Sequence, residues 1–83
     1  MTKRNIMKLD MIFNHFGMEH QIKKFKEEVK EYLESEELEE IADIYVLVNQ
    51  LYMNDKMLRK LVEHKINRTL NRIAEGYYNK ETI

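Results

Sequence analysis

Apolar residues recur at helical spacing along almost the whole chain and divide it into four segments. Gly17 marks the end of the first segment, and Gly76 marks the end of the last. Ser35 is expected to cap the third helix and Asp55 the fourth, because both side chains can accept a hydrogen bond from a free backbone N–H group. The predicted helices span residues 5–16, 19–34, 36–54 and 56–75. We expect the tail YYNKETI beyond them to be loose.

The third and fourth predicted helices carry long apolar faces that we expect to be buried. On the third helix this face comprises Leu38, Ile41, Ile44, Tyr45, Val48, Leu51 and Tyr52. On the fourth helix it comprises Leu58, Val62, Ile66, Thr69 and Ile73. Faces of this kind predict helices that pack against one another rather than isolated ones.

Composition supports an all-α fold. The 83 residues include no proline and two glycines, and they are rich in good helix formers. We therefore predict one domain, residues 1–83, folded as a compact bundle of about four helices around a central antiparallel helix hairpin. A core this small gains from sharing its apolar surface with a second copy, so a homo-oligomer is expected.

The net charge of -1 is strongly segregated along the chain. Residues 27–43 hold nine acids and one lysine, whereas residues 56–72 hold six basic residues and one glutamate. The overall balance argues against a nucleic-acid partner. No apolar run approaches the roughly 18 residues that span a membrane, and there is no cysteine. We expect a cytoplasmic protein with no membrane partner.

Four acids in the acidic segment form two pairs of identical spacing. Glu28 and Glu31 stand in EEVKE, and Glu40 and Asp43 stand in EEIAD, as mirror images about the middle of the segment. In a helical hairpin the four carboxylates would converge at the border of the apolar faces, where they repel one another unless a cation lies between them. Oxygen ligands without histidine or cysteine favour Mg²⁺ or Mn²⁺ over zinc. The pattern therefore predicts a divalent-metal site.

Two other metal sites do not fit the sequence. A di-iron carboxylate bundle needs glutamate three residues before histidine in two helices, and none of the three histidines has it. An EF-hand needs an acidic loop with a central glycine, which is also missing. Glutamate-rich helix surfaces that merely face solvent remain the alternative to a metal site.

The stretch HQIKKFKEEVKEYLESEELEEIADIYVLVNQL, residues 20–51, resembles the MazG-like nucleotide pyrophosphohydrolases of the all-α NTP pyrophosphatase superfamily. It contains their paired ExxE and ExxD motifs after a run with Gln21, Lys24 and Glu28. The segment HKINRTLNRI is similar to the basic last helix of small members of this family. One difference is the spacing: only eight residues separate the two acidic motifs here, fewer than in many members.

The resemblance implies Mg²⁺-dependent hydrolysis of a nucleoside triphosphate, an NTP or a dNTP, to the monophosphate and pyrophosphate. It also implies that the enzyme is a homodimer or homotetramer. It implies that Glu28, Glu31, Glu40 and Asp43 hold the metal. Lys24, Lys65, Arg68 and Arg72 are then expected to bind phosphate, and Gln21 and Asn49 to contact the nucleotide. The alternative is a non-catalytic helical interaction or nucleotide-binding module, in which the charged faces bind a partner.

Overall fold

The computed structural model describes residues 1–76 and contains four α-helices. They are α1 (Lys3–Phe16), α2 (Met18–Ser35), α3 (Leu38–Asn54) and α4 (Lys56–Ala74). The described residues contain no strand, so the all-α prediction is confirmed. The tail that we expected to be loose lies outside the described residues. None of the four helices is long and apolar enough to cross a membrane.

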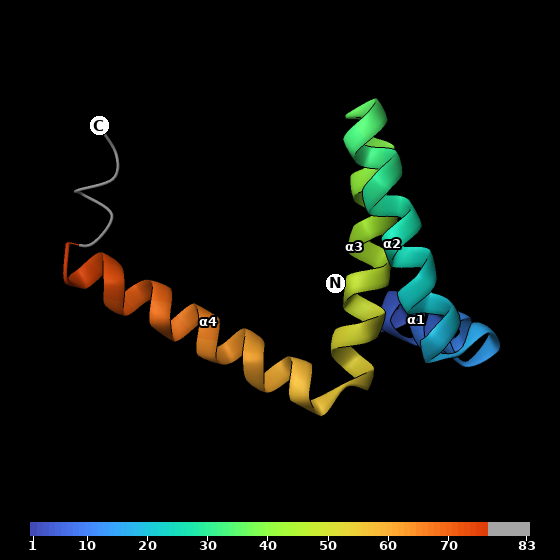
Figure 1. Ribbon diagram of the computed structural model, residues 1–83. Helices are drawn as coiled ribbons and strands as arrows, with labels where there is room; N and C mark the ends of the chain where they lie inside the picture. The colour runs from blue at the N-terminus through green and yellow to red at the C-terminus, as the bar shows by residue number, and fades with distance from the viewer. Residues whose placement is uncertain (77–83) are drawn as a thin grey trace.

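The antiparallel hairpin of α2 and α3 is the centre of the fold, and α1 crosses its base (Figure 1). Leu9 of α1 and Leu47 of α3 are the buried apolar side chains of this unit. Between them lies Gln50, which is completely buried. Its side chain accepts a hydrogen bond from Gln21 Nε2 at 2.7 Å and donates one to the Leu9 carbonyl at 3.3 Å. One side chain therefore ties all three packed helices together.

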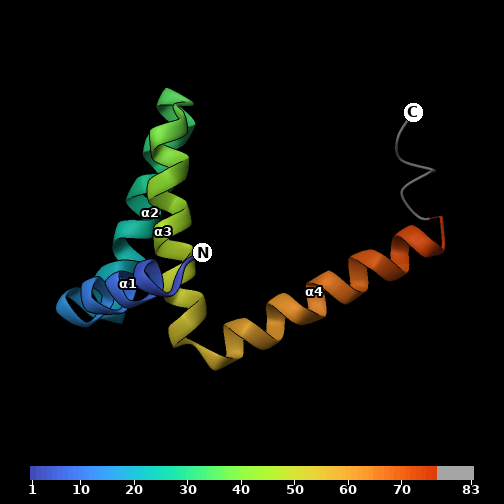
Figure 2. The same ribbon diagram turned by 180° about the vertical axis from the view of Figure 1, so that it is seen from behind.

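Helix α4 leaves this unit at an elbow and extends away from it (Figures 1 and 2). Among the described residues it packs against α3 alone and contributes no buried side chain. The radius of gyration, 16.0 Å, accordingly exceeds the about 12 Å of a globular chain of this length. The long arm formed by α4 is the main departure from a closed four-helix bundle.

The prediction that the apolar faces of α3 and α4 are buried is wrong for much of their length within one chain. The apolar residues of these predicted faces that are exposed are Leu38, Ile41, Tyr45, Val48 and Tyr52 on α3, and Ile66 and Ile73 on α4. The cause is the elbow, because it directs α4 away from the hairpin instead of folding it back over α3 (Figure 2).

Candidate metal centre

A two-residue turn brings the acidic motifs of α2 and α3 together. Glu36 adopts the left-handed conformation, with φ 57°, and its N–H donates to the Tyr32 carbonyl at 2.7 Å. This conformation ends α2 and reverses the chain. Ser35 was expected to cap the third helix, but it is the last residue of α2, and Glu37 occupies the N-cap position of α3 without a side-chain cap. The short turn sets the two helices antiparallel, as the mirror spacing of the acids requires.

Three of the four predicted carboxylates meet between α2 and α3. One oxygen each from Glu28, Glu40 and Asp43 lies within 4.8 Å of the other two. Glu28 is buried, with 5% of its surface exposed, Glu40 is half-buried, and Asp43 is exposed. The cluster therefore runs from the interior of the hairpin to the solvent.

Lys24 neutralises one side of this cluster. Its Nζ lies 3.1 Å from Glu28 Oε1 and 3.9 Å from Glu27 Oε2. The hydrogen bond and charge of this ammonium group hold the pKa of Glu28 below its ordinary value, and Glu28 in turn raises the pKa of Lys24. Glu28 is therefore ionised at neutral pH in spite of its burial.

Glu40 experiences the opposite effect. Interaction with the Glu28 carboxylate, loss of hydration, and the negative charges of Glu31 and Glu28 raise its pKa to about 7. Glu31 is exposed and lies outside the group of three, but its charge acts on Glu40. Near neutral pH Glu40 thus exchanges readily between its acid and its carboxylate.

Two buried oxygens of the cluster, Glu28 Oε2 and Glu40 Oε2, have no hydrogen-bond donor. A buried carboxylate oxygen without a donor or a cation is costly, and two of them side by side cost more. Only a shared proton or a cation relieves this arrangement. Carboxylate oxygens at the base of an open cluster suit a hard divalent cation such as Mg²⁺.

A cavity of about 420 Å³ opens beside the carboxylates, on the face of the hairpin where α1 meets α2. Its walls include Phe16, whose ring stacks on that of His20 with centroids 4.6 Å apart and planes 14° from parallel. Lys24, Glu28 and Asp43 line the opposite part of the wall. The cavity thus joins an aromatic surface to the acidic cluster. The sequence alone offers Phe16, Tyr45 and Tyr52 as aromatic residues on which a base could stack, but it does not show that Phe16 stacks on His20 beside the acidic motifs.

The two predicted nucleotide contacts have different places in the structure. Gln21 lines the cavity but is almost fully buried, with bonds to Gln50 and, at 2.9 Å, to His20 Nδ1. Asn49 donates to the Tyr45 carbonyl of its own helix at 2.8 Å and does not line the cavity. The Gln21–Gln50 pair was missed from sequence, although a glutamine three residues after Leu47 stands on the buried side of α3.

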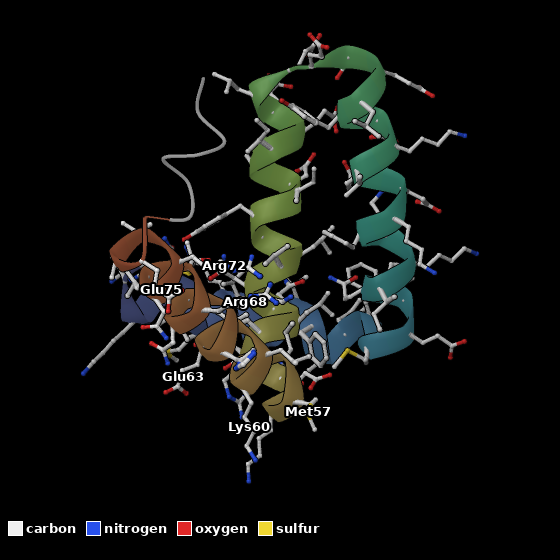
Figure 3. The ribbon with its side chains drawn as sticks, turned by 60° about the vertical axis from the view of Figure 1, so that its left-hand side comes forward. Met57, Lys60, Glu63, Arg68, Arg72 and Glu75 are labelled. Atoms are coloured by element: carbon white, nitrogen blue, oxygen red, sulfur yellow. The ribbon has the colours of Figure 1, made fainter. Side chains whose placement is uncertain are left out.

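Only one of the predicted phosphate-binding residues lies at the cluster within the chain. Lys24 contacts Glu28, whereas Lys65, Arg68 and Arg72 lie on the projecting α4. Figure 3 shows Arg68 and Arg72 on the side of α4 nearer the α2–α3 hairpin, with Lys60 on the opposite side. A single chain does not bring this basic stripe to the carboxylates.

The raised pKa of Glu40 predicts how stability depends on pH. The folded state holds the Glu40 proton more tightly than the unfolded chain, whose value is near 4.5. This contribution to stability is therefore complete below that value and is lost as the pH rises to about 7. Thermal unfolding without divalent ions should show a lower melting temperature at pH 8 than at pH 5 for this reason.

The variant Glu40→Gln isolates the effect, since its amide cannot ionise and can donate to Glu28. We expect the melting temperature of the variant to depend less on pH than that of the wild type, and Mg²⁺ to raise the wild-type value at pH 8. Identical pH profiles for the two proteins would contradict the assignment.

Comparison with known proteins gives no relative: the chain matches no family model, and no curated protein or solved structure is significantly similar to it.

Proposed function

We propose that this protein is an Mg²⁺-dependent nucleoside triphosphate pyrophosphohydrolase. The observation that carries the proposal is the pair of buried, donor-free oxygens on Glu28 and Glu40 beside the exposed carboxylate of Asp43. A bound cation would relieve this arrangement, and the exposed side of the cluster faces the cavity. The resemblance of the paired acidic motifs to the MazG-like enzymes gives the reaction: water and a nucleoside triphosphate yield the monophosphate and pyrophosphate.

In the proposed site Glu28, Glu40 and Asp43 would hold Mg²⁺, and Glu31 would add negative charge nearby. A bound Mg²⁺ ion would neutralise triphosphate oxygens and lower the pKa of a coordinated water. A neighbouring acid that does not hold the metal, such as Glu31, would take a proton from the attacking water. The water oxygen forms a bond to phosphorus, and the bond between the α-phosphate and pyrophosphate breaks.

Lys24 has a second role in this proposal. It lies on the cavity wall and keeps Glu28 ionised, so the innermost metal ligand remains a carboxylate. Its exposed side also offers a cation for a phosphate oxygen. The Phe16–His20 stack provides a flat surface on which a nucleobase can lie.

A non-catalytic interaction module is the second candidate, and the exposed apolar arm of α4 favours it. In such a module the acids would contribute only charge, so neutralising them would relieve repulsion and stabilise the fold. Neutralising these acids should therefore abolish pyrophosphate release if the protein is the enzyme, but should stabilise the fold if it is an interaction module.

The experiment that tests the proposal is pyrophosphate release from a panel of NTPs and dNTPs, with and without Mg²⁺ or Mn²⁺. We expect release with at least one substrate, and none when the metal is removed by a chelator. No release from any substrate would favour the interaction module.

A further inference from the structure

A chain of hydrogen bonds runs from the backbone of α1 through two glutamines to the wall of the cavity beside the acidic cluster. Gln50 lies 3.3 Å from the Leu9 carbonyl and 2.7 Å from Gln21. Gln21 in turn lies 2.9 Å from Nδ1 of His20, which lines the cavity. Gln50 is completely buried and Gln21 is 3% exposed, so both amides depend on partners within the protein.

The first member of this chain determines the direction of every bond in it. The Leu9 carbonyl can only accept, so the Gln50 atom that faces it is the amide Nε2. The remaining Gln50 atom, Oε1, can only accept, and Gln21 therefore donates to it with its own Nε2. Gln21 Oε1 is left facing His20, and this oxygen can only accept as well. His20 Nδ1 must therefore carry a proton.

A neutral histidine with its proton on Nδ1 has a free lone pair on Nε2. The His20 ring is held from two sides, by Gln21 at Nδ1 and by Phe16, whose ring stacks on its face. Stacking covers the face of the ring and leaves its edge open. His20 thus offers a ligand in the cavity an acceptor at Nε2 rather than a donor.

The other polar side chains of the cavity wall do not offer an uncharged donor. Gln21 uses both of its amide atoms within the protein, and Lys24 is bonded to Glu28. Glu28 and Asp43 present carboxylate oxygens, which are acceptors. Within the described part of the chain, the side chains of this wall therefore combine one ammonium group with several acceptors. A neutral polar group of a ligand is held there only if it donates.

We propose that His20 selects the nucleobase at this site: its Nε2 accepts a hydrogen bond from an exocyclic amino group, so the cavity binds cytosine or adenine in preference to uracil or hypoxanthine. The ligand class rests on the proposed function, which makes the ligand a nucleotide. An amino base presents a donor where the corresponding keto base presents an acceptor oxygen. Such an oxygen would face the Nε2 lone pair and lose the water that hydrates it, without gaining a donor.

The first measurement locates the proton in the wild-type protein, without nucleotide or metal. A long-range ¹H–¹⁵N correlation spectrum at pH 8 reports the charge of the His20 ring and the nitrogen that carries its proton. We expect a neutral ring with the proton on Nδ1. A proton on Nε2, an even mixture of the two forms, or a doubly protonated ring would overturn the proposal.

Gln50 does not contact His20 in this chain of bonds, yet it acts as a positioning residue for the His20 proton. In Gln50→Ala the Gln21 amide is free to flip and to present its Nε2 to His20, which makes the form with a proton on Nε2 accessible. The spectrum should then show both forms. Asn49→Ala, which removes an amide bonded within α3, should keep the wild-type spectrum.

Circular dichroism at the temperature of the spectra establishes that each variant is folded. A folded Gln50→Ala with the proton still confined to Nδ1 would contradict the directed chain. If Gln50→Ala does not fold, the wild-type spectrum and the binding measurements decide the proposal.

The second measurement is the binding of two matched pairs of nucleoside monophosphates with Mg²⁺, followed by chemical-shift titration. CMP and AMP carry the amino group, whereas UMP and IMP carry an oxygen at the same ring position. In each pair that binds, we expect the amino member to bind about 10-fold more tightly, which corresponds to one hydrogen bond. Equal affinities, tighter binding of the keto member, or no binding of any of the four would overturn the proposal.

The variant His20→Phe separates the acceptor from the aromatic surface. It keeps a ring that can stack on Phe16 but has no nitrogen, so base binding should persist while the two members of a pair become equal. His15→Phe is the matched control, because His15 contacts the same Phe16 ring at 4.7 Å but does not line the cavity. It should keep the preference for the amino base. A preference that survived in His20→Phe would refute the role of Nε2.

None of these measurements depends on turnover, so they separate this proposal from the proposed function. Selective binding of amino bases without pyrophosphate release would refute the enzyme and leave the role of His20 intact. Pyrophosphate release without any preference between the members of a pair would do the reverse.

Discussion

Replacing Asp43 with asparagine should lower Mg²⁺-dependent pyrophosphate release by about 100-fold or more while leaving the fold intact. Asp43 is the exposed carboxylate of the cluster, so the substitution removes a metal ligand without disturbing the interior. Removing one group of a charge-stabilising site commonly costs two to three orders of magnitude in rate. The measurement is single-substrate pyrophosphate release, with Mn²⁺ affinity measured by calorimetry.

The matched control is Glu39→Gln, which removes an exposed acid from the first turn of the same helix but not from the cluster. It should release pyrophosphate within a few-fold of the wild-type rate. Equal turnover in the wild type and Asp43→Asn would refute the metal site. If instead Asp43→Asn raised the melting temperature of a protein that releases no pyrophosphate, the acids would belong to an interaction module.

Replacing Gln50 with alanine should lower the free energy of unfolding by about 2–4 kcal/mol. The Gln50 side chain is completely buried and bonds to both Gln21 and the Leu9 carbonyl. Its loss leaves the buried Gln21 amide without this acceptor, removes the bond to the Leu9 carbonyl, and opens a cavity. A domain of this size has only about 4–12 kcal/mol of stability in total, so the variant should unfold at much lower urea concentration.

Asn49→Ala provides the comparison, because the Asn49 amide bonds only within α3 and is less buried. Urea unfolding at one fixed protein concentration should place this variant within about 1 kcal/mol of the wild type. Equal losses for Gln50→Ala and Asn49→Ala would show that the three-helix connection contributes little.

The helices could be predicted from the sequence because their signals are local. Periodic apolar residues, Gly17 and the Asp55 cap gave four helices with bounds within about two residues. The Ser35 prediction failed because α2 continues through Ser35 and is ended by the left-handed conformation of Glu36. The N-cap position of α3 therefore falls on Glu37. Sequence does not reveal that a non-glycine residue will accept this conformation.

The candidate site was predictable in part for the same reason. Mirror spacing about a short turn identified Glu28, Glu40 and Asp43, whose convergence depends only on hairpin geometry. The distances between α4 and the cluster depend instead on the elbow angle, at which Arg59 donates hydrogen bonds to the Tyr52 and Met53 carbonyls of α3. Nothing in the periodicity of α4 encodes that angle.

The two-residue turn at Glu36 and Glu37 also fixes the rotation of α3 about its own axis relative to α2. One extra residue between Ser35 and Leu38 would rotate α3 by about 100° relative to α2, unless the turn absorbed it, and would turn Glu40 away from Glu28. Lengthening both helices by matched turns on the hairpin side would keep the phase and move only the tip. The hairpin can therefore change length only in certain steps: whole turns added to both helices preserve the carboxylate cluster, whereas a single inserted residue separates its members.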